Sequence, residues 1–352
     1  MSATTSTTRS PAVPAVLPSH DFLRTPLLAT ARPEGFKEWH HFLVQTRGRR
    51  ILINFSLMSE TLGAGPPRLV PRIIVVVHDG RWTGAVERFA DADVSADLCT
   101  LSVGGSRMHI DPDGFRVVLD LPDRHIHGEL LFTPGRRPSL GRVNNQPVGA
   151  GRISWLFVPR LTATGRLRID GVEHRLDGDA AYHDHNWGRF RWGDDFGWEW
   201  GSILPADPAD PWSVVFTRKT DRRRLRCLSQ ALYVWHHDEL AAMFRDSAVR
   251  MESSGLLGRP PDCTLPAPMR LVLGSEASDV PAALTITASS AVGTLEVVFR
   301  PDSHARLAQP SELHPARSVV LSEISGTARV RGSIGDRGFD APGTGVVEVL
   351  HG

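Results

Sequence analysis

The sequence predicts an all-β protein, and three observations lead to that fold class. Short runs rich in valine, isoleucine and aromatic residues recur along most of the 352 residues, separated by glycine, proline and aspartate. Asp170 and Gly171 join two alternating arms, as in a tight β-hairpin. Only residues 239–245 have the pattern of a short helix. Strands spaced in this way favour barrels or sandwiches over a parallel α/β sheet, with helix in under about a tenth of the chain.

The predicted strands follow the chain from residue 41 to residue 350. They span residues 41–46, 50–58, 72–77, 115–121, 125–132, 165–169, 172–176, 213–218, 227–235, 284–289, 294–300, 318–321, 326–331 and 345–350. The first two flank an Arg-Gly-Arg turn and are predicted to pair as a hairpin. Between residues 169 and 172, Asp-Gly supplies the positive φ values that a two-residue type I′ turn needs.

The chain is expected to divide into an arm and two β-domains. Residues 1–20 are rich in serine, threonine, proline and alanine without apolar periodicity, which predicts a disordered N-terminal arm. The two β-domains are placed at residues 21–203 and 204–352. The proline- and aspartate-rich residues 205–211 are either a linker between them or one long surface turn.

Composition excludes several classes of partner. Lys plus Arg is 40 and Asp plus Glu is 39, so a net charge of +1 gives no electrostatic reason to expect nucleic acid. The three cysteines are far apart and form neither a disulfide framework nor a zinc motif. No signal peptide or stretch of ~20 apolar residues is evident. We therefore expect a cytoplasmic protein without an obligate protein partner, with at most transient membrane contact to collect a hydrophobic small-molecule substrate.

The residues with the most chemistry lie between Tyr182 and Gly201. Strand alternation divides the central side chains between two faces, with Tyr182, Asp184 and Asn186 on one and His183, His185 and Trp187 on the other. Trp198 and Trp200 are likewise expected to share a face, opposite Glu199. Aromatic walls with a few polar groups suit a pocket for an apolar ligand. Burial beside tryptophan also raises a carboxyl pKa, which would let an acid stay protonated and donate.

Other interpretations of these residues remain open. His183 and His185 could chelate zinc from one strand face, but no third ligand is identifiable nearby, so no metal is expected. The tryptophans could be ordinary core residues, and the aspartate and asparagine could close turns. Residues 37–42, Lys-Glu-Trp-His-His-Phe, form a second, weaker candidate. No phosphate-binding loop, nucleophile elbow or HExxH motif is present.

Taken together, these motifs resemble the AttH-like family of lipocalin-related proteins, which includes carotenoid 1,2-hydratase, kievitone hydratase and relatives of the fungal decalin-forming Diels–Alderases. The matching segments are residues 38–42, 178–188, 198–201 and 343–348. Their order and spacing extend the resemblance over residues 35–350. His40 and His41 stand where the family's Glu-Trp-Trp-Tyr form has aromatic residues.

The resemblance implies two lipocalin-like antiparallel β-barrel halves, with the ligand at or near their interface and with neither a metal nor an organic cofactor. Carried over by position, Asp184 is the proton donor, Tyr182, His183 and His185 set its environment, and Glu38 is a further acid. The implied substrate-binding residues are Trp39, Asn186, Trp187, Trp198, Glu199 and Trp200.

Three functions are therefore carried forward. The first is an enzyme of isoprenoid or polyene biosynthesis that protonates a carbon–carbon double bond, with hydration or cyclisation of the resulting cation. The second is a pericyclase that folds a polyene into a reactive conformer. The third is a lipocalin-type carrier without chemistry. An acid that faces the ligand would favour the alkene-protonating enzyme, and a hydrogen-bond donor to a ligand carbonyl would favour the pericyclase. A cavity without ionisable groups would favour the carrier.

Overall fold

The structure is a computed structural model that describes residues 16–29, 31–46, 48–60, 65–135, 139–193, 196–258, 263–265, 280–314 and 318–351. Strands account for 72% of the described residues and helix for 5%, which confirms the predicted all-β fold with two barrel-like halves. Within the described ranges, the strands form one 12-stranded and one 10-stranded sheet.

The first sheet is built from the N-terminal part of the chain. Its strands neighbour one another in the order β4-β3-β2-β1-β12-β11-β9-β8-β7-β6-β5, and β10 pairs with β11 beside this path. The strands are β1 (Phe36–Thr46), β2 (Arg49–Glu60), β3 (Arg68–Asp79), β4 (Trp82–Arg88), β5 (Ala92–Val94), β6 (Thr100–Val103), β7 (Ser106–Asp111), β8 (Gly114–Leu121), β9 (Ile126–Pro134), β10 (Gly141–Val148), β11 (Gly151–Ile169) and β12 (Val172–Arg189).

The second sheet follows the order β16-β15-β14-β13-β22-β21-β20-β19-β17, and β18 adds a short parallel pairing to β20. Its strands are β13 (Gly197–Pro205), β14 (Trp212–Thr220), β15 (Cys227–His236), β16 (Glu239–Arg245), β17 (Val249–Ser254), β18 (Cys263–Leu265), β19 (Ala283–Ser290), β20 (Gly293–Pro310), β21 (Ser318–Ile334) and β22 (Arg337–His351). The helical turns are α1 (Val16–His20), α2 (Thr25–Leu28), η1 (Pro122–Arg124) and η2 (Asp246–Ala248).

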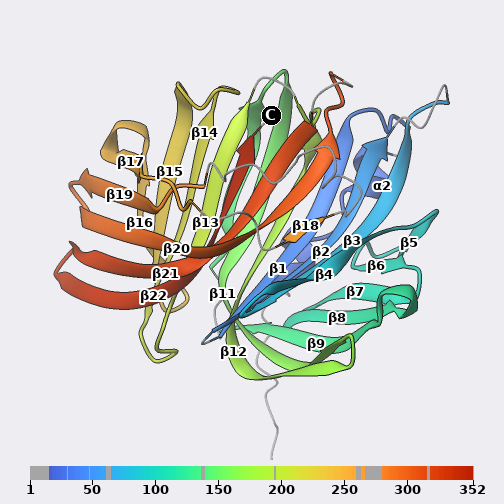
Figure 1. The fold of residues 1–352 in the computed structure, drawn as a ribbon, viewed down its shortest axis with the longest axis horizontal. Helices are drawn as coiled ribbons and strands as arrows, with labels where there is room; N and C mark the ends of the chain where they lie inside the picture. Colours follow the sequence, from blue (N-terminus) through green and yellow to red (C-terminus); the bar gives the residue numbers. More distant parts are fainter. Residues whose placement is uncertain are drawn as a thin grey trace, which may run out of the picture.

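The two barrel-like halves lie side by side, and the orange and red strands β20–β22 extend from the second half toward the blue strands β1–β3 (Figure 1). The chain changes sheet between Arg189 and Gly197, which is earlier than the expected boundary after residue 203. Residues 206–211 connect the paired strands β13 and β14, so they form a surface turn within the second half.

Burial along β12 explains why the candidate site lies where it does. The first part of the strand alternates between exposed and buried side chains, as expected for a strand with one face in water. From Ala181 to Trp187 every side chain is buried, because the interior of the first half covers one face and the second half covers the other. β13 is buried from Gly197 to Leu204 for the same reason.

Each half has its own apolar core, and a third cluster joins them. Phe42, Phe115 and Phe132 belong to the core of the first half, and Phe216 and Phe299 to that of the second. The joining cluster takes its side chains from both sheets and contains Leu43, Val143, Trp155, Phe157, Tyr182, Trp200, Val215, Ala231, Tyr233, Trp235 and Val346. The halves are therefore held together by packed aromatic residues around the candidate site.

The Asp-Gly hairpin is confirmed, and two local predictions are corrected. Asp170 and Gly171 have φ values of 49° and 81°, as a type I′ turn requires. Residues 239–245, predicted as a helix, form strand β16, whose buried Ala242 and Phe244 alternate with exposed neighbours. Residues 16–20 of the predicted disordered arm form α1, with Leu17 fully buried, whereas residues 1–15 lie outside the described residues.

The structure also bears on the expectations for the cysteines and for membrane spans. Cys99 and Cys227 are free thiols. In the described part of the chain, no helix is both long and apolar enough to cross a membrane.

Candidate active site

The site is organised by two antiparallel strands, β1 and β12, whose side chains alternate between opposite faces. His41 lies opposite Asp184, and Trp39 lies opposite Asn186, so these four side chains share the face that looks toward the second half. His40 lies opposite His185 and projects into the first half. The predicted division of Tyr182, Asp184 and Asn186 from His183, His185 and Trp187 is confirmed.

A pocket with two adjoining compartments lies between the halves. The larger compartment takes its walls from β1–β4 of the first sheet and β20–β22 of the second, and is lined by Trp39, His41, Leu52, Asn54, Ser56, Met58, Arg72, Ile74, Val86, Trp192, Trp198, Leu307, Ala308, Val319, Leu321, Glu323, Glu348 and Leu350. The smaller is lined by Trp39, His41, Gln146, Ile153, Trp155, Asp184, Asn186, Trp198, Trp200, Thr217, Lys219 and Glu348. Trp39, His41, Trp198 and Glu348 belong to both, so the compartments adjoin each other.

Asp184 is the carboxyl group of the smaller compartment. Its two oxygens accept hydrogen bonds from the Tyr182 hydroxyl at 2.9 Å and the Asn186 amide at 2.7 Å. Burial raises the pKa of Asp184 to about 8, although the Tyr182 hydrogen bond opposes the shift. At neutral pH this carboxyl is therefore mainly protonated and can act as an acid.

Glu323 and Glu348 form a second acidic group in the pocket. They lie directly opposite each other on β21 and β22. Burial raises the pKa of Glu348 to about 7, and burial together with the Glu348 charge holds the pKa of Glu323 well above its usual range. Two carboxyls this close retain a proton between them at neutral pH, because both cannot ionise cheaply. The Trp198 indole donates a hydrogen bond to Glu348.

His41 gives the pocket a neutral imidazole. Its ring packs edge-on against Trp200 with 5.6 Å between ring centroids. Burial lowers the pKa of His41 to about 3, and its Nε2 has no hydrogen-bond partner among the described residues. This nitrogen is therefore free to form a hydrogen bond with a water molecule or ligand in the pocket.

The opposite face of the same strands carries a hydrogen-bonded ion network inside the first half. Asp21 accepts bonds from His183 at 2.8 Å and His185 at 2.7 Å, and Glu38 accepts one from the second nitrogen of His185 at 2.8 Å. The Nδ1 of His183 faces the backbone carbonyl of His41 at 3.0 Å. All four ring nitrogens of His183 and His185 thus lie at hydrogen-bond distance from oxygen atoms, three of them from carboxylate oxygens.

The charges in this network follow from its contacts. Burial alone would raise the pKa of Asp21, but His183 and His185 together hold it well below its usual range. Burial lowers the pKa of His185, and hydrogen bonds to Asp21 and Glu38 more than reverse that effect. Glu38 also accepts the backbone amide of Thr25 at 2.7 Å, which ties α2 to β1.

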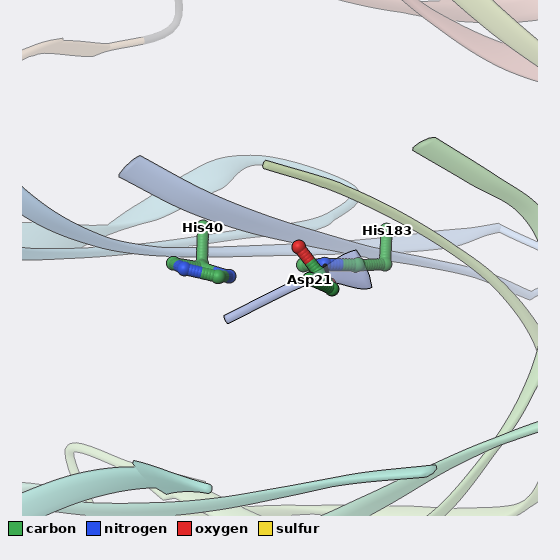
Figure 2. A group of neighbouring side chains, drawn as sticks. All are labelled: Asp21, His40 and His183. Carbon is green, nitrogen blue, oxygen red and sulfur yellow. Dashed lines mark hydrogen bonds and ion pairs between the residues drawn. The ribbon is translucent and has the colours of Figure 1, made fainter. Parts of the chain in front are cut away.

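The expectation that no third metal ligand lies near His183 and His185 is wrong. Asp21, His40 and His183 offer ligand atoms within 4.8 Å of one another (Figure 2). Glu38, His40 and His185 do so as well. In both groups the histidine of β12 is already hydrogen-bonded to the carboxylate, at 2.8 Å for His183 with Asp21 and for His185 with Glu38. Both ring nitrogens of His40, by contrast, have no hydrogen-bond partner among the described residues. His40 stacks on His185 with 3.8 Å between ring centroids. The arrangement is that of an ion network more than that of a metal centre, since protonated imidazoles offer no lone pair to a metal.

Comparison with solved structures identifies the fold. A candidate AttH protein from Nitrosomonas europaea is 13% identical, with a TM-score of 0.63 over 90% of this chain and 92% of that chain. CghA in complex with Sch210972 is 12% identical, with a TM-score of 0.62 over 91% and 89%. Kievitone hydratase from Nectria haematococca is 11% identical, with a TM-score of 0.57 over 92% and 93%. The chain has the AttH-like fold.

The AttH-like fold matches the resemblance expected from the motifs, and at 11–13% identity the likeness is one of fold. No protein-family model matches the sequence, and no curated protein sequence matches it either. The paired strands β1 and β12 bring together the motifs of residues 38–42 and 178–188.

The AttH-like fold brings some of the expected site residues together and separates others. Trp39, Asp184, Asn186, Trp198 and Trp200 line the pocket, and Tyr182 contacts it through Asp184. His183, His185 and Glu38, expected beside Asp184, lie on the opposite face of the sheet, because each is an odd number of positions away in strand register.

Two residues expected to bind substrate also lie away from the pocket. Glu199 faces the interior of the second half, where Arg218 and Arg224 form ion pairs with it. This position agrees with the predicted opposition of Glu199 to Trp198 and Trp200. Trp187 projects into the first half, and the Arg24 guanidinium lies 4.7 Å from its ring centroid.

The structure also contains functional groups that sequence reasoning missed. Glu348 ends the recognised segment 343–348 but received no role, and Glu323 is recognisable only once β21 pairs with β22. Asp21 falls just after the predicted disordered arm. His41 was noted only as a departure from the aromatic pattern, although its alternation with Trp39 already placed both on one face.

Proposed function

We propose that this protein is a cofactor-independent enzyme that protonates a carbon–carbon double bond of an apolar isoprenoid or polyene in the pocket between its halves. The observation that carries the proposal is the gathering of three carboxyl groups, Asp184, Glu323 and Glu348, whose pKa values burial raises toward or above neutrality. Acids held protonated at neutral pH and placed among indole rings suit alkene protonation.

The proposed reaction begins at Asp184. Its O–H bond breaks as a C–H bond forms on one alkene carbon, which leaves a carbocation on the other carbon and a carboxylate on the enzyme. In hydration, a water oxygen bonds to the cation and its surplus proton returns to a basic group, the Asp184 carboxylate directly or through His41. In cyclisation, an internal alkene or heteroatom captures the cation, and a proton lost from the product restores the acid. The net reaction is addition of water in hydration and isomerisation in cyclisation, and neither needs an oxidant or a reductant.

The walls of the pocket support such a cation. Trp39, Trp198 and Trp200 present indole rings to the compartments, and Trp155 and Trp192 add two more. A desolvated cation beside an indole face gains about 0.5–2 kcal/mol per contact. The larger compartment is lined mainly by aliphatic side chains and tryptophan rings, which suits an extended apolar substrate.

A pericyclase is the second candidate. The specific observation in its favour is Lys219, a nitrogen donor in the smaller compartment that could activate a carbonyl next to a reacting alkene. The three carboxyl groups in the cavity count against a carrier without chemistry.

The test is turnover in heavy water, with lycopene and geranylgeranoic acid as substrates. Proton addition predicts products with one new carbon-bound deuterium. Asp184→Asn should lower turnover by at least ~10² with little change in ligand affinity, because only the proton source is removed. EDTA should leave turnover unchanged. Products without deuterium, or full activity of the variant, would count against Asp184 as the proton donor. Loss of activity in EDTA that zinc restores would contradict metal independence.

A further inference from the structure

Lys219 places a basic nitrogen in the wall of the pocket that holds Asp184. It lies on β14 directly opposite Trp198 of β13, and both side chains line the smaller compartment. The residue is only 8% exposed. The sequence has one other lysine, Lys37, whose amine forms an ion pair with Glu312 at 2.9 Å.

Lys219 differs from Lys37 in having no carboxylate partner among the residues that the structure describes. Its amine donates a hydrogen bond to the neutral side-chain oxygen of Gln146, on β10 of the first sheet. Burial lowers the pKa of Lys219 to about 7. A desolvated ammonium with only a neutral partner is unfavourable, and it can donate further hydrogen bonds.

Two acids of the smaller compartment, Asp184 and Glu348, accept hydrogen bonds from residues other than Lys219. The oxygens of Asp184 accept bonds from Tyr182 and Asn186, and burial raises its pKa to about 8. Glu348 accepts a bond from Trp198. A pocket with largely neutral acids and an amine that has no carboxylate partner is complementary to a ligand that brings its own negative oxygen.

We propose that Lys219 binds a delocalised oxyanion, a carboxylate or an enolate, at one end of the substrate. The apolar remainder then extends past Trp198 into the larger compartment, which adjoins the smaller one. This inference rests on the proposed function for placing the substrate in this pocket, and it names the substrate class: an oxygenated polyene or isoprenoid, in place of a hydrocarbon.

Fluorescence titration with cis-parinaric acid, a conjugated tetraene carboxylic acid, tests the inference, with its methyl ester as the uncharged probe. The wild-type protein should bind the acid at least about tenfold more tightly than the ester, as expected for a charge-assisted hydrogen bond. Lys219→Met should remove that preference and leave ester binding within about twofold. Lys219→Arg should retain a preference for the acid. Arg223→Met, which removes an exposed positive charge on the β14–β15 turn, is the matched control and should behave as wild type.

Equal binding of acid and ester by the wild-type protein, or no binding of either, would overturn the inference, and so would an unchanged preference in Lys219→Met. Loss of an unpaired buried charge should not lower the melting temperature of Lys219→Met, which separates loss of binding from misfolding. The titration needs no turnover. Failure of Asp184 as the proton donor would therefore leave the binding result intact, and the two failures are distinguishable.

Discussion

Asp184 and Asp21 are both buried aspartates, yet their pKa values move in opposite directions. Asp21 lies between His183 and His185, which favour its charged form. Asp184 accepts bonds from a neutral hydroxyl and a neutral amide, so burial dominates. The partners of a carboxyl group therefore decide whether it serves as an ion in the network or as an acid in the pocket.

The raised pKa of Asp184 predicts a dependence of stability on pH. Its pKa is 3.8 without perturbation and about 8 in the folded protein, so the folded state keeps a proton that the unfolded state loses between these values. Its contribution to stability is fully present below pH 3.8 and is lost as the pH rises to about 8, at up to about 1.4 kcal/mol per pH unit. The free energy of unfolding can be measured with denaturant at about pH 5, 6.5 and 8, roughly across that window. It should fall less steeply with pH for Asp184→Asn than for the wild-type protein. Parallel declines for the two proteins would refute the shift.

At the residue scale, sequence alternation predicted which side chains share a face but not which face meets the ligand. Tyr182, Asp184 and Asn186 were grouped correctly from period-two spacing. Glu199 was assigned to the pocket although it was predicted to lie opposite the tryptophans. Only the packing of one half against the other shows that the tryptophan face lines the cavity.

At the scale of elements, the segment around α1 and α2 seals the ion network. Asp21 follows α1, and the backbone amides of Arg24 and Thr25 at the start of α2 donate to Glu38. A segment just past a predicted disordered arm thus supplies a fully buried carboxylate to two histidines of β12. Local composition could not indicate this, because the contacts span more than 160 positions.

Asp21→Asn tests that account. Removing one carboxylate leaves two buried imidazoles facing a neutral amide, which should cost about 3–5 kcal/mol in the free energy of unfolding. Chemical denaturation is the measurement, and Asp113→Asn, at an exposed aspartate, is the control. If Asp21→Asn is as stable as the control, the network does not hold the first half together.

The strand β16 shows a different limit of element prediction. Residues 239–245 contain good helix formers, but a single helix of seven residues is too short to be stable alone. Pairing with β15 and burial of Ala242 and Phe244 favour the strand. The Asp170-Gly171 hairpin was predictable because its turn chemistry is local.

At the scale of the whole molecule, the two halves create the site by covering each other. Asp184 belongs to the first sheet, whereas Glu323 and Glu348 belong to the second. The tryptophan-rich contact between the halves removes water from all three carboxyls, and their desolvation raises the pKa values. The resemblance to the AttH-like family implied two halves with a ligand at or near their interface, but the partnership of acids from separate sheets required the three-dimensional structure.

Infrared difference spectroscopy of the full chain tests this central claim most directly, because protonated carboxyl groups and carboxylates absorb separately and no substrate is needed. At pH 7, about one unit below the pKa of Asp184, the wild-type spectrum minus that of Asp184→Asn should contain a protonated carboxyl band. That band should disappear as the pH rises through about 8. Asp113→Asn, the exposed control, should remove a carboxylate band instead. If the wild-type protein instead has a carboxylate band at pH 7 that Asp184→Asn lacks, the account is contradicted, since the pocket would then hold no protonated acid at that position.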